Sequence, residues 1–401
     1  MARPLHLRNA SVWDPRHDTA QTLRRDLAVA ARVLATMPSN ALTLDFDGLT
    51  VFPGLVNAHD HLELNHYPRT KFRERYDNAH QWGEDVNACL NASPFRELRA
   101  VPLDDRLFIG GLKNLLCGAT TVAHHNPPHR ALFQSNFPVR VVRRYGWAHS
   151  LHFSTDAEIR ASFAATPPDM PWMIHLAEGT DATAYSEYAH LKALGGIGPN
   201  TVLIHGVGLD LEMLGSDRPA LVWCPTSNHY LLGQTVTPDV LERATVALGS
   251  DSRLTADGDL LDELRAAHHT AFGAGNVDAL LPLVTEQAAQ ILRLAEAGNL
   301  RTGAYGDFIA LRTGDCATTA LCHARRANLA LVVKGGVPQI GDPEIMAQFA
   351  DVPAVAATLD GRPKVIHRTL AVRLAKCTLQ EAGLTVDTDA VKSRRRLFSR
   401  S

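Results

Sequence analysis

Residues 53–61 read PGLVNAHDH and place two histidines, His59 and His61, one residue apart behind a short apolar segment. In an extended strand, residues i and i+2 point to the same face, so both imidazoles can reach one point in space. This spacing is typical of a metal-ligand pair. The alternative is a solvated pair in a loop, because a chain with 19 histidines can contain such a pair by chance. The pair therefore needs support from elsewhere in the chain.

Three further apolar runs end in residues that can bind or serve a metal ion. Residues 172–174 lead into His175, which is followed by Glu178; residues 201–204 lead into His205; residues 245–250 lead into Asp251. Short apolar runs separated by helix-length stretches predict buried parallel strands in βαβ units. The carboxyl ends of such strands form the active face of a (β/α)8 barrel, so we expect these four strand ends to converge on one pocket.

Six motifs along the chain together resemble the amidohydrolase superfamily. They occur in the family's order and span most of the sequence: PGLVNAHDH at 53–61, GATTV at 118–122, HLAEG at 175–179, IHG at 204–206, CPTSN at 224–228 and LGSDS at 248–252. The chain looks like the branch of heterocycle deaminases and triazine hydrolases, which includes guanine, S-adenosylhomocysteine and aminofutalosine deaminases.

The resemblance implies an α/β fold: a TIM-like (β/α)8 barrel and a small β-sandwich formed by both chain ends. A length of 401 residues accommodates a barrel of about 250 residues and a smaller unit. We assign residues 1–50 and 303–377 to the β-sandwich, 51–302 to the barrel and 378–401 to a C-terminal tail. The apolar runs predict seven barrel strands, because residues 140–151 form one long strand or two short ones with almost no helix between them. One βα unit is therefore expected to be degenerate or missing.

The resemblance also implies one divalent metal ion, held by His59, His61, His175 and Asp251. Three nitrogen donors and one oxygen donor suit zinc and are acceptable to iron. Many relatives hold two ions through a carboxylated lysine on the fourth strand. Residues 138–152 contain no lysine, and the stretch from Arg143 to Gly146 supplies only guanidinium groups, which cannot be deprotonated to bind a metal. This difference favours a single ion.

Three residues are expected to carry the chemistry. Glu178 is predicted to shuttle protons from water to the substrate, because burial in a closed pocket raises the proton affinity of a carboxylate. By resemblance, His205 polarises the substrate, and Asp251 accepts the proton of the water in addition to binding the metal. The alternatives are a surface glutamate, a packed histidine and a helix N-cap, respectively.

Residues 62–100 are predicted to form a long loop that holds the substrate. Asn65 and Trp82 in this loop, and His125 at the end of the second strand, are the candidate substrate contacts. Trp82 can equally pack the loop onto the barrel. His124 and His125 can also serve packing or supporting roles, and neither is placed on the metal.

Composition excludes several classes of protein. The 40 basic and 42 acidic residues give a net charge of −2, so neither nucleic acid nor an anionic membrane is an expected partner. No apolar run approaches the roughly 18 residues of a spanning helix, and the six cysteines form no CxxC pair. We expect a cytoplasmic protein with a small-molecule substrate. The resemblance makes a homodimer possible, and residues 392–397 are expected to belong to a disordered basic tail.

The leading hypothesis is a metal-dependent hydrolase that removes ammonia from an amino-substituted, nucleobase-like heterocycle through a metal-bound hydroxide. A second hypothesis is hydrolysis of a cyclic amide or another non-peptide C–N bond by the same site. A third, of a different class, is a catalytically inactive barrel that binds a small molecule.

Overall fold

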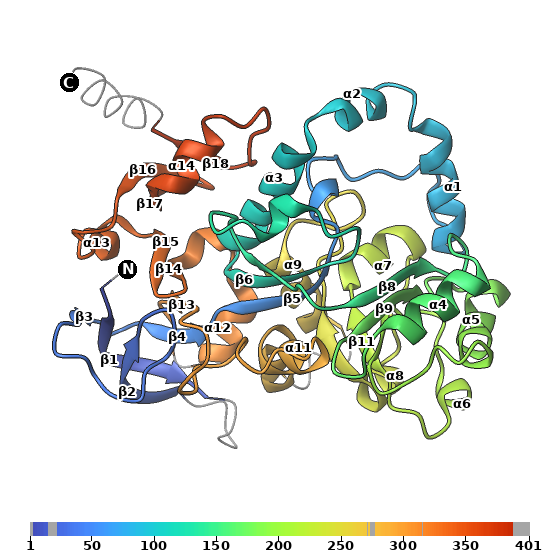
Figure 1. The fold of residues 1–401 in the computed structure, drawn as a ribbon, viewed down its shortest axis with the longest axis horizontal. Coiled ribbons are helices and arrows are strands. Elements are labelled where there is room, and N and C mark those ends of the chain that lie inside the picture. Colours follow the sequence, from blue (N-terminus) through green and yellow to red (C-terminus); the bar gives the residue numbers. More distant parts are fainter. Residues whose placement is uncertain (1–2, 15–21, 271, 273–276, 315, 388–401) are drawn as a thin grey trace.

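Eight parallel strands form the centre of the part of the protein that the structure describes. The computed structural model describes residues 3–14, 22–270, 272, 277–314 and 316–387 (Figure 1). A three-stranded sheet contains β5 (Leu55–Asp60), β6 (Ala119–His124) and β7 (Arg140–Val141). A five-stranded sheet contains β8 (Gly146–Ser150), β9 (Trp172–Leu176), β10 (Thr201–His205), β11 (Ala220–Trp223) and β12 (Thr245–Leu248). Most of these residues are buried, as expected for parallel strands covered on both faces.

Backbone hydrogen bonds join the two sheets where β12 meets β5. The amides of Ser250 and Asp251 donate to the His59 carbonyl at 2.9 and 3.1 Å, and the His61 amide donates to the Asp251 carbonyl at 2.8 Å. Gly249 permits this approach, because a Cβ atom there would lie 2.7 Å from the Cβ of His59. The strand ends that carry the predicted site are thus brought together by the backbone itself.

The region between β7 and β8 differs from the predicted strand count. Residues 140–151 contain two short strands, and four residues with no helix connect them. A two-residue strand is too short to show a periodic pattern, which is why the sequence predicted seven strands. Among the described residues, no ladder pairs β7 with β8, so the arrangement is TIM-like but not closed by hydrogen bonds.

Helices surround these strands. Residues 62–100, which were predicted to form a long loop, contain two α-helices and a 3-10 turn. This segment contains η1 (Leu62–Leu64), α1 (Ala79–Cys89) and α2 (Phe95–Ala100). The outer helices are α3 (Leu103–Leu116), α4 (Asp156–Ala165), α5 (Ala182–Ala193), α6 (Leu211–Leu214), α7 (Pro225–Leu232), α8 (Pro238–Arg243), α9 (Leu260–His268) and α11 (Glu286–Ile291). Short 3-10 turns are η2 (Arg130–Phe133), η3 (Val277–Ala279), η4 (Leu281–Val284) and η5 (Arg326–Asn328).

Within the described residues, the N-terminal and C-terminal regions combine in one sheet of ten strands. The N-terminal part supplies β1 (Leu5–Trp13), β2 (Thr22–Val29), β3 (Leu42–Asp45) and β4 (Thr50–Pro53). The C-terminal part supplies β13 (Phe308–Leu311), β14 (Leu329–Lys334), β15 (Val337–Gly341), β16 (Ala354–Leu359), β17 (Arg362–His367) and β18 (Leu384–Val386), with α12 (Ala317–His323), α13 (Pro343–Met346) and α14 (Arg368–Leu374).

The predicted β-sandwich is not confirmed, because β4 and β13 pair edge to edge and make the two halves one continuous sheet. Successive residues serve opposite faces: Val51 packs in one hydrophobic cluster and Phe52 in another. The sheet also extends into the predicted tail, since β18 pairs with β16. Residues 388–401, with the basic run at 392–397, lie outside the described residues.

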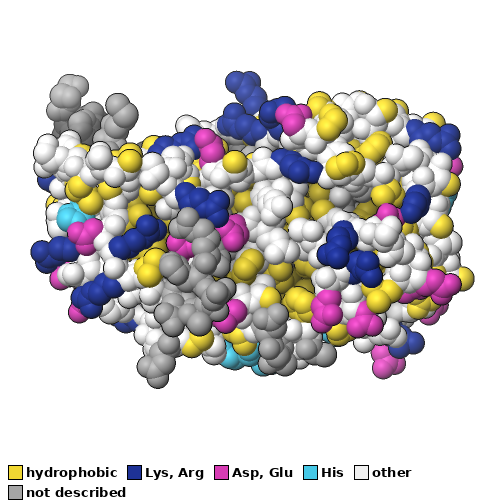
Figure 2. Space-filling model, turned by 90° about the horizontal axis from the view of Figure 1, so that it is seen from below, with side chains coloured by type: hydrophobic (Ala, Val, Ile, Leu, Met, Phe, Trp, Pro, Cys, Tyr) yellow, Lys and Arg dark blue, Asp and Glu magenta, His cyan; other side chains and the backbone are white. Residues whose placement is uncertain are grey.

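Basic and acidic side chains are interspersed on the face drawn in Figure 2.

In the part of the chain that the structure describes, no helix has the length and apolar character needed to cross a membrane.

Candidate active site

The four predicted metal ligands meet at the carboxyl ends of β5, β9 and β12. The Nε2 atoms of His61 and His175 lie 3.3 Å apart. The Oδ1 atom of Asp251 lies 3.6 Å from Nε2 of His59 and 3.6 Å from Nε2 of His61. All four residues are buried, and both ring nitrogens of His59 and Nδ1 of His61 have no hydrogen-bond partner. Buried polar atoms without partners are costly, so this cluster requires a ligand to satisfy them.

This cluster fits a divalent metal ion. Two donors at about 2.1 Å from a tetrahedral ion are about 3.4 Å apart, which matches the observed separations of 3.3 and 3.6 Å. Burial lowers the pKa of His61 and of His175 well below the usual range, so both imidazoles are neutral, as metal ligands must be. The Nδ1 atom of His175 donates to the His149 carbonyl at 2.8 Å, which leaves the lone pair on Nε2.

Two hydroxyl groups orient the carboxylate of Asp251. The Oδ2 atom accepts hydrogen bonds from Ser227 at 2.8 Å and Thr255 at 2.5 Å, and Oδ1 therefore faces the imidazoles. Burial alone would raise the pKa of Asp251, but the adjacent imidazole of His59 and the other neighbouring histidines lower it below its usual range. The backbone of Asp251 has a φ of 49°, a conformation that non-glycine residues rarely adopt outside constrained sites.

Glu178 and His205 form a second pair beside the ligands. The Nε2 atom of His205 lies 3.5 Å from Oε2 of Glu178. Burial, with the nearby carboxylates of Asp251 and Glu187, raises the pKa of Glu178 well above its usual range, so this side chain can carry a proton near neutral pH. Burial lowers the pKa of His205 to about 4, so its imidazole is neutral.

The tautomer of His205 follows from its partner in the CPTSN motif. The Nδ1 atom donates to Oδ1 of Asn228 at 2.9 Å, and the amide of Asn228 is oriented by Thr235, which accepts from Nδ2 at 3.2 Å. The lone pair of His205 is therefore on Nε2. In this form Nε2 accepts a hydrogen bond, so the predicted polarisation of a substrate by donation would require a protonated ring.

A cavity of about 130 Å³ opens over these groups. It is lined by His61, His175, Glu178, His205 and Asp251, by the apolar side chains of Leu64, Trp82 and Phe153, and by polar residues that include His80, Asn126 and His149. The structure thus places the predicted metal and proton-transfer residues, except His59, around one space. No pattern in the sequence predicted that Phe153 or His80 lines this cavity.

The three predicted substrate contacts lie in different surroundings. Trp82 lines the cavity, and its Nε1 donates to the Thr70 carbonyl at 3.0 Å. Asn65 does not line the cavity; its buried amide donates to Oδ1 of Asp60 at 2.7 Å and accepts from the Arg253 amide at 3.2 Å. His125 does not line it either, and lies instead among the metal-ligand histidines.

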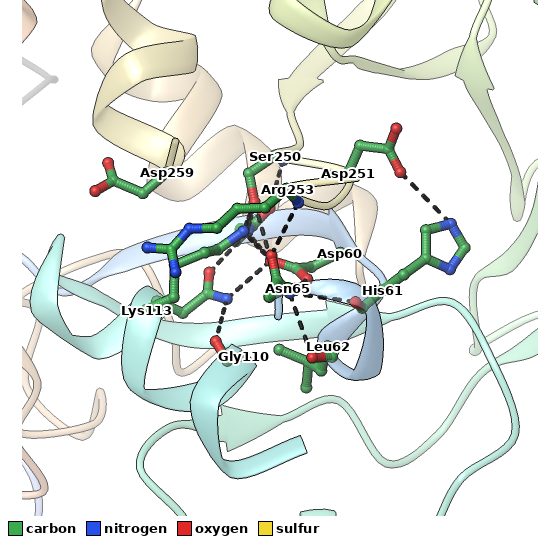
Figure 3. A network of polar contacts seen from close by, with 12 residues as sticks. Asp60, His61, Leu62, Asn65, Gly110, Lys113, Ser250, Asp251, Arg253 and Asp259 are labelled. Carbon is green, nitrogen blue, oxygen red and sulfur yellow. Dashed lines mark hydrogen bonds and ion pairs between the residues drawn. The ribbon is translucent and has the colours of Figure 1, made fainter. Parts of the chain in front are cut away.

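A buried polar network around Asp60 lies on the opposite side of β5 from the metal-ligand cluster (Figure 3). Asp60 points away from the imidazoles of its neighbours, and its Oδ2 lies 3.0 Å from Nζ of Lys113, which is fully buried on α3. Further donors to Oδ2 are Asn114 at 2.8 Å, Ser250 at 2.9 Å and Asn57 at 3.2 Å. Strand parity predicts that Asp60 faces opposite to the histidines, but nothing in the sequence identified Lys113 as its partner.

The fold and the site together define an α/β protein of the TIM-like type with a cluster of histidines and an aspartate that could hold a metal ion. The model of the amidohydrolase family matches residues 137–339, slightly more than half of the chain. The chain belongs to the amidohydrolase family and is an enzyme of that family. The resemblance predicted from the six motifs is confirmed.

Curated relatives and solved structures agree with this membership. The chain is 26% identical over 415 residues to the 5-methylthioadenosine/S-adenosylhomocysteine deaminase of Syntrophobacter fumaroxidans, covering 90% of this chain and 87% of that protein. The enzyme of the same name from Nitratidesulfovibrio vulgaris is 24% identical over 363 residues, covering 73% and 80%.

Two solved structures share the fold. An adenosine deaminase from Xanthomonas campestris with bound zinc has a TM-score of 0.67 at 17% identity, covering 87% of this chain and 96% of that one. Atrazine chlorohydrolase from Arthrobacter aurescens complexed with zinc has a TM-score of 0.66 at 18% identity, covering 86% and 99%.

Proposed function

We propose that this protein hydrolytically removes the exocyclic amino group of an amino-substituted, adenine-like heterocycle. The observation that carries the proposal is the carboxyl group of Glu178, which lines the cavity with a side chain that is 13% exposed and a raised pKa, 3.5 Å from the neutral His205 and beside the metal-ligand cluster. The names of the curated relatives and of the adenosine deaminase with this fold support an adenine-type ring.

We further propose that the eight parallel strands complete a barrel with a degenerate third βα unit. Within it, His59, His61, His175 and Asp251 hold one divalent ion, zinc or iron. When bound, the ion supplies a Lewis acid that makes water nucleophilic near neutral pH. The roles of the side chains follow from their hydrogen-bonding states.

Glu178 moves protons in this reaction. Protonated, its carboxyl group delivers a proton to the ring nitrogen next to the attacked carbon; ionised, it takes one from the attacking water. The Nε2 lone pair of His205 accepts a hydrogen bond from that water and fixes its orientation, and Oδ1 of Asp251 is the second acceptor. The net reaction exchanges one amino group for one oxygen and releases ammonia.

The cavity wall suits a flat, partly apolar substrate. Leu64, Trp82 and Phe153 supply apolar surface, while Asn126, Ser252 and Thr255 supply hydrogen-bonding groups. A planar heterocycle matches both features, because its faces are apolar and its edges carry nitrogen atoms.

The test is an ammonia-release assay of the metal-loaded protein on adenosine, 5′-methylthioadenosine, S-adenosylhomocysteine, guanine, cytosine and amino-triazines, with Glu178→Gln measured in parallel. We expect ammonia from at least one adenine-type substrate without ring opening, and release about 10³-fold slower from the variant. A new carboxylate in place of ammonia would show amide hydrolysis instead. A protein that binds no metal and is inert towards all of these compounds would be a binding barrel.

A further inference from the structure

A second cavity, of about 610 Å³, lies away from the candidate active site. Its wall includes Arg140, the first residue of β7, and Asp169, which lies in the loop before β9. Both residues are at the amino ends of strands, whereas His175 and the other metal-site residues are at the carboxyl ends. The two cavities have no lining residue in common.

The wall of this second cavity carries an excess of positive charge. One acidic side chain, that of Asp169, lines it together with five basic ones, which are Arg140, Arg143, Arg144, Arg293 and Lys334. We call it the basic cavity. The chain as a whole has a net charge of −2, so this concentration of cations is local. Cations that lie close together repel one another unless anions compensate them.

Carboxylates pair with only two of the five cations. Arg144 pairs with Asp169 at 2.8 Å, and Arg140 pairs with Asp307 at 3.3 Å. In the part of the chain that the structure describes, the other three have no carboxylate within ion-pair distance. They donate instead to backbone carbonyls: Arg143 to Phe133 at 3.1 Å, Lys334 to Phe137 at 2.6 Å and Arg293 to Pro199. A carbonyl satisfies a hydrogen bond but does not neutralise the charge of its donor.

Two of the cations show this lack of compensation most clearly. The guanidinium of Arg140 stacks on the ring of Tyr305, 3.6 Å from its centroid, and its bonds to Asp307 use Nη2 alone. Its Nε atom is buried and has no hydrogen-bond partner. Burial lowers the pKa of Lys334 to about 8, although Asp307 opposes the shift. An anion in the basic cavity would stabilise both charges.

We propose that the basic cavity binds an organic phosphate. A phosphate group carries up to two negative charges and several acceptor oxygens, and arginine and lysine are the residues that bind it in proteins. A carboxylate carries one charge and would compensate fewer of these cations. The apolar part of the ligand would contact Leu132, Phe137 and Leu292, which line the same cavity. This inference does not depend on the proposed function, since the two cavities share no residue.

The test is isothermal titration calorimetry of the metal-loaded protein with phenyl phosphate, inorganic phosphate and benzoate at constant ionic strength. The cavity variant, Arg143→Gln/Arg293→Gln, removes two charges from exposed residues that have no carboxylate partner. The matched control is Arg325→Gln/Arg362→Gln, which removes two exposed arginines from a different cavity, lined also by Asp259, Asp262 and Asp360.

We expect the parent to bind one phenyl phosphate per chain, more tightly than inorganic phosphate or benzoate. The cavity variant should bind phenyl phosphate about tenfold more weakly, because each hydrogen bond to a charged group contributes about 1.5 to 3 kcal/mol. The control variant should remain within about twofold of the parent, because it leaves the basic cavity intact.

Equal binding of phenyl phosphate by the parent and the cavity variant, or no binding by the parent, would overturn the proposal. Benzoate bound as tightly as phenyl phosphate would contradict the phosphate class. If the cavity variant does not fold, a crystal structure of the parent with phenyl phosphate decides: a ligand beside Arg143, Arg293 or Lys334 supports the proposal, and a ligand found only elsewhere contradicts it. None of these measurements uses ammonia release, so the failure of the proposed function and the failure of this proposal are distinguishable.

Discussion

The surroundings of residues 59–61 differ in hydrogen bonding between the side that faces the metal-ligand cluster and the opposite side, where Asp60 meets its supporting network. On the metal-facing side, formed by His59, His61, His175 and Asp251, several ring nitrogens are buried without partners. On the supporting side, both carboxylate oxygens of Asp60 are satisfied by Lys113 and by neighbouring amide and hydroxyl groups (Figure 3). Adjacent residues of β5 thus differ: the ring nitrogens of His59 lack hydrogen-bond partners, whereas both carboxylate oxygens of Asp60 have them.

The difference separates binding from positioning. Buried nitrogens without hydrogen-bond partners destabilise the metal-free protein, and binding of a metal ion removes this cost. A network whose hydrogen bonds are all formed holds its side chains in place before the ion binds. Changes on the metal-facing side should therefore alter metal binding or reaction rate with small effects on the metal-free fold. Changes on the supporting side should destabilise the fold.

The largest expected effect is that of Glu178→Gln. The amide cannot shuttle protons, so we expect kcat to fall by about 10³-fold while metal content stays at the parent level. The exposed Glu212→Gln is the control, and metal analysis with steady-state kinetics is the measurement. Retained activity would remove Glu178 from the mechanism.

Replacing Lys113 with methionine should disrupt the network around Asp60 and destabilise the fold. The change leaves the Asp60 carboxylate buried without its cation, so we expect a loss of about 3 kcal/mol in the free energy of unfolding of the metal-free protein. The control is Lys192→Met, which removes an ion pair at the surface and should cost less than about 1 kcal/mol. Denaturant unfolding compares them, and equal losses would contradict the division into two sides.

Glu263 on α9, a buried carboxyl group outside both sides, makes the stability of the protein depend on pH. Burial raises its pKa to about 8, although hydrogen bonds from Thr226 on α7 oppose the rise. Between its unfolded pKa of about 4.3 and pH 8 the folded state binds more protons than the unfolded state, so stability falls as pH rises through this window. From pH 6 to 8 we expect this group to remove about 2 kcal/mol, at a slope of at most about 1.4 kcal/mol per pH unit. Glu263→Gln should abolish this contribution in unfolding measured at both pH values, and an unchanged pH dependence would contradict the assignment.

The smallest expected effect is that of Ser227→Ala. Loss of the hydroxyl that orients Oδ2 of Asp251 should weaken metal affinity about tenfold, because groups that orient a ligand tune its binding. Competition with a chelator measures the affinity, with the exposed Ser186→Ala as control. Unchanged affinity would show that Thr255 alone holds the carboxylate.

The two sides also differ in how far the sequence predicted them. Strand parity and the strand-end motifs were sufficient to predict that His59, His61, His175 and Asp251 meet, because the ends of parallel strands share one edge. Lys113 was missed because the side of α3 that faces β5 depends on packing between elements distant in sequence.

Adjacent histidines show the same limit. His124 and His125 point to opposite sides of β6, and their direction depends on a strand register that the sequence does not specify. Asn65 was predicted as a substrate contact because it lies in a polar loop segment, but the turn η1 directs its amide to Asp60 instead.

The central claim is that the metal-facing side binds an ion which the reaction requires. The most direct measurement is the metal stoichiometry and ammonia release of the parent and of His59→Ala, after chelation and reloading with zinc or iron. The account predicts one ion per chain and ammonia release for the parent, and neither for the variant. A His59→Ala protein that keeps both the ion and the activity would contradict it.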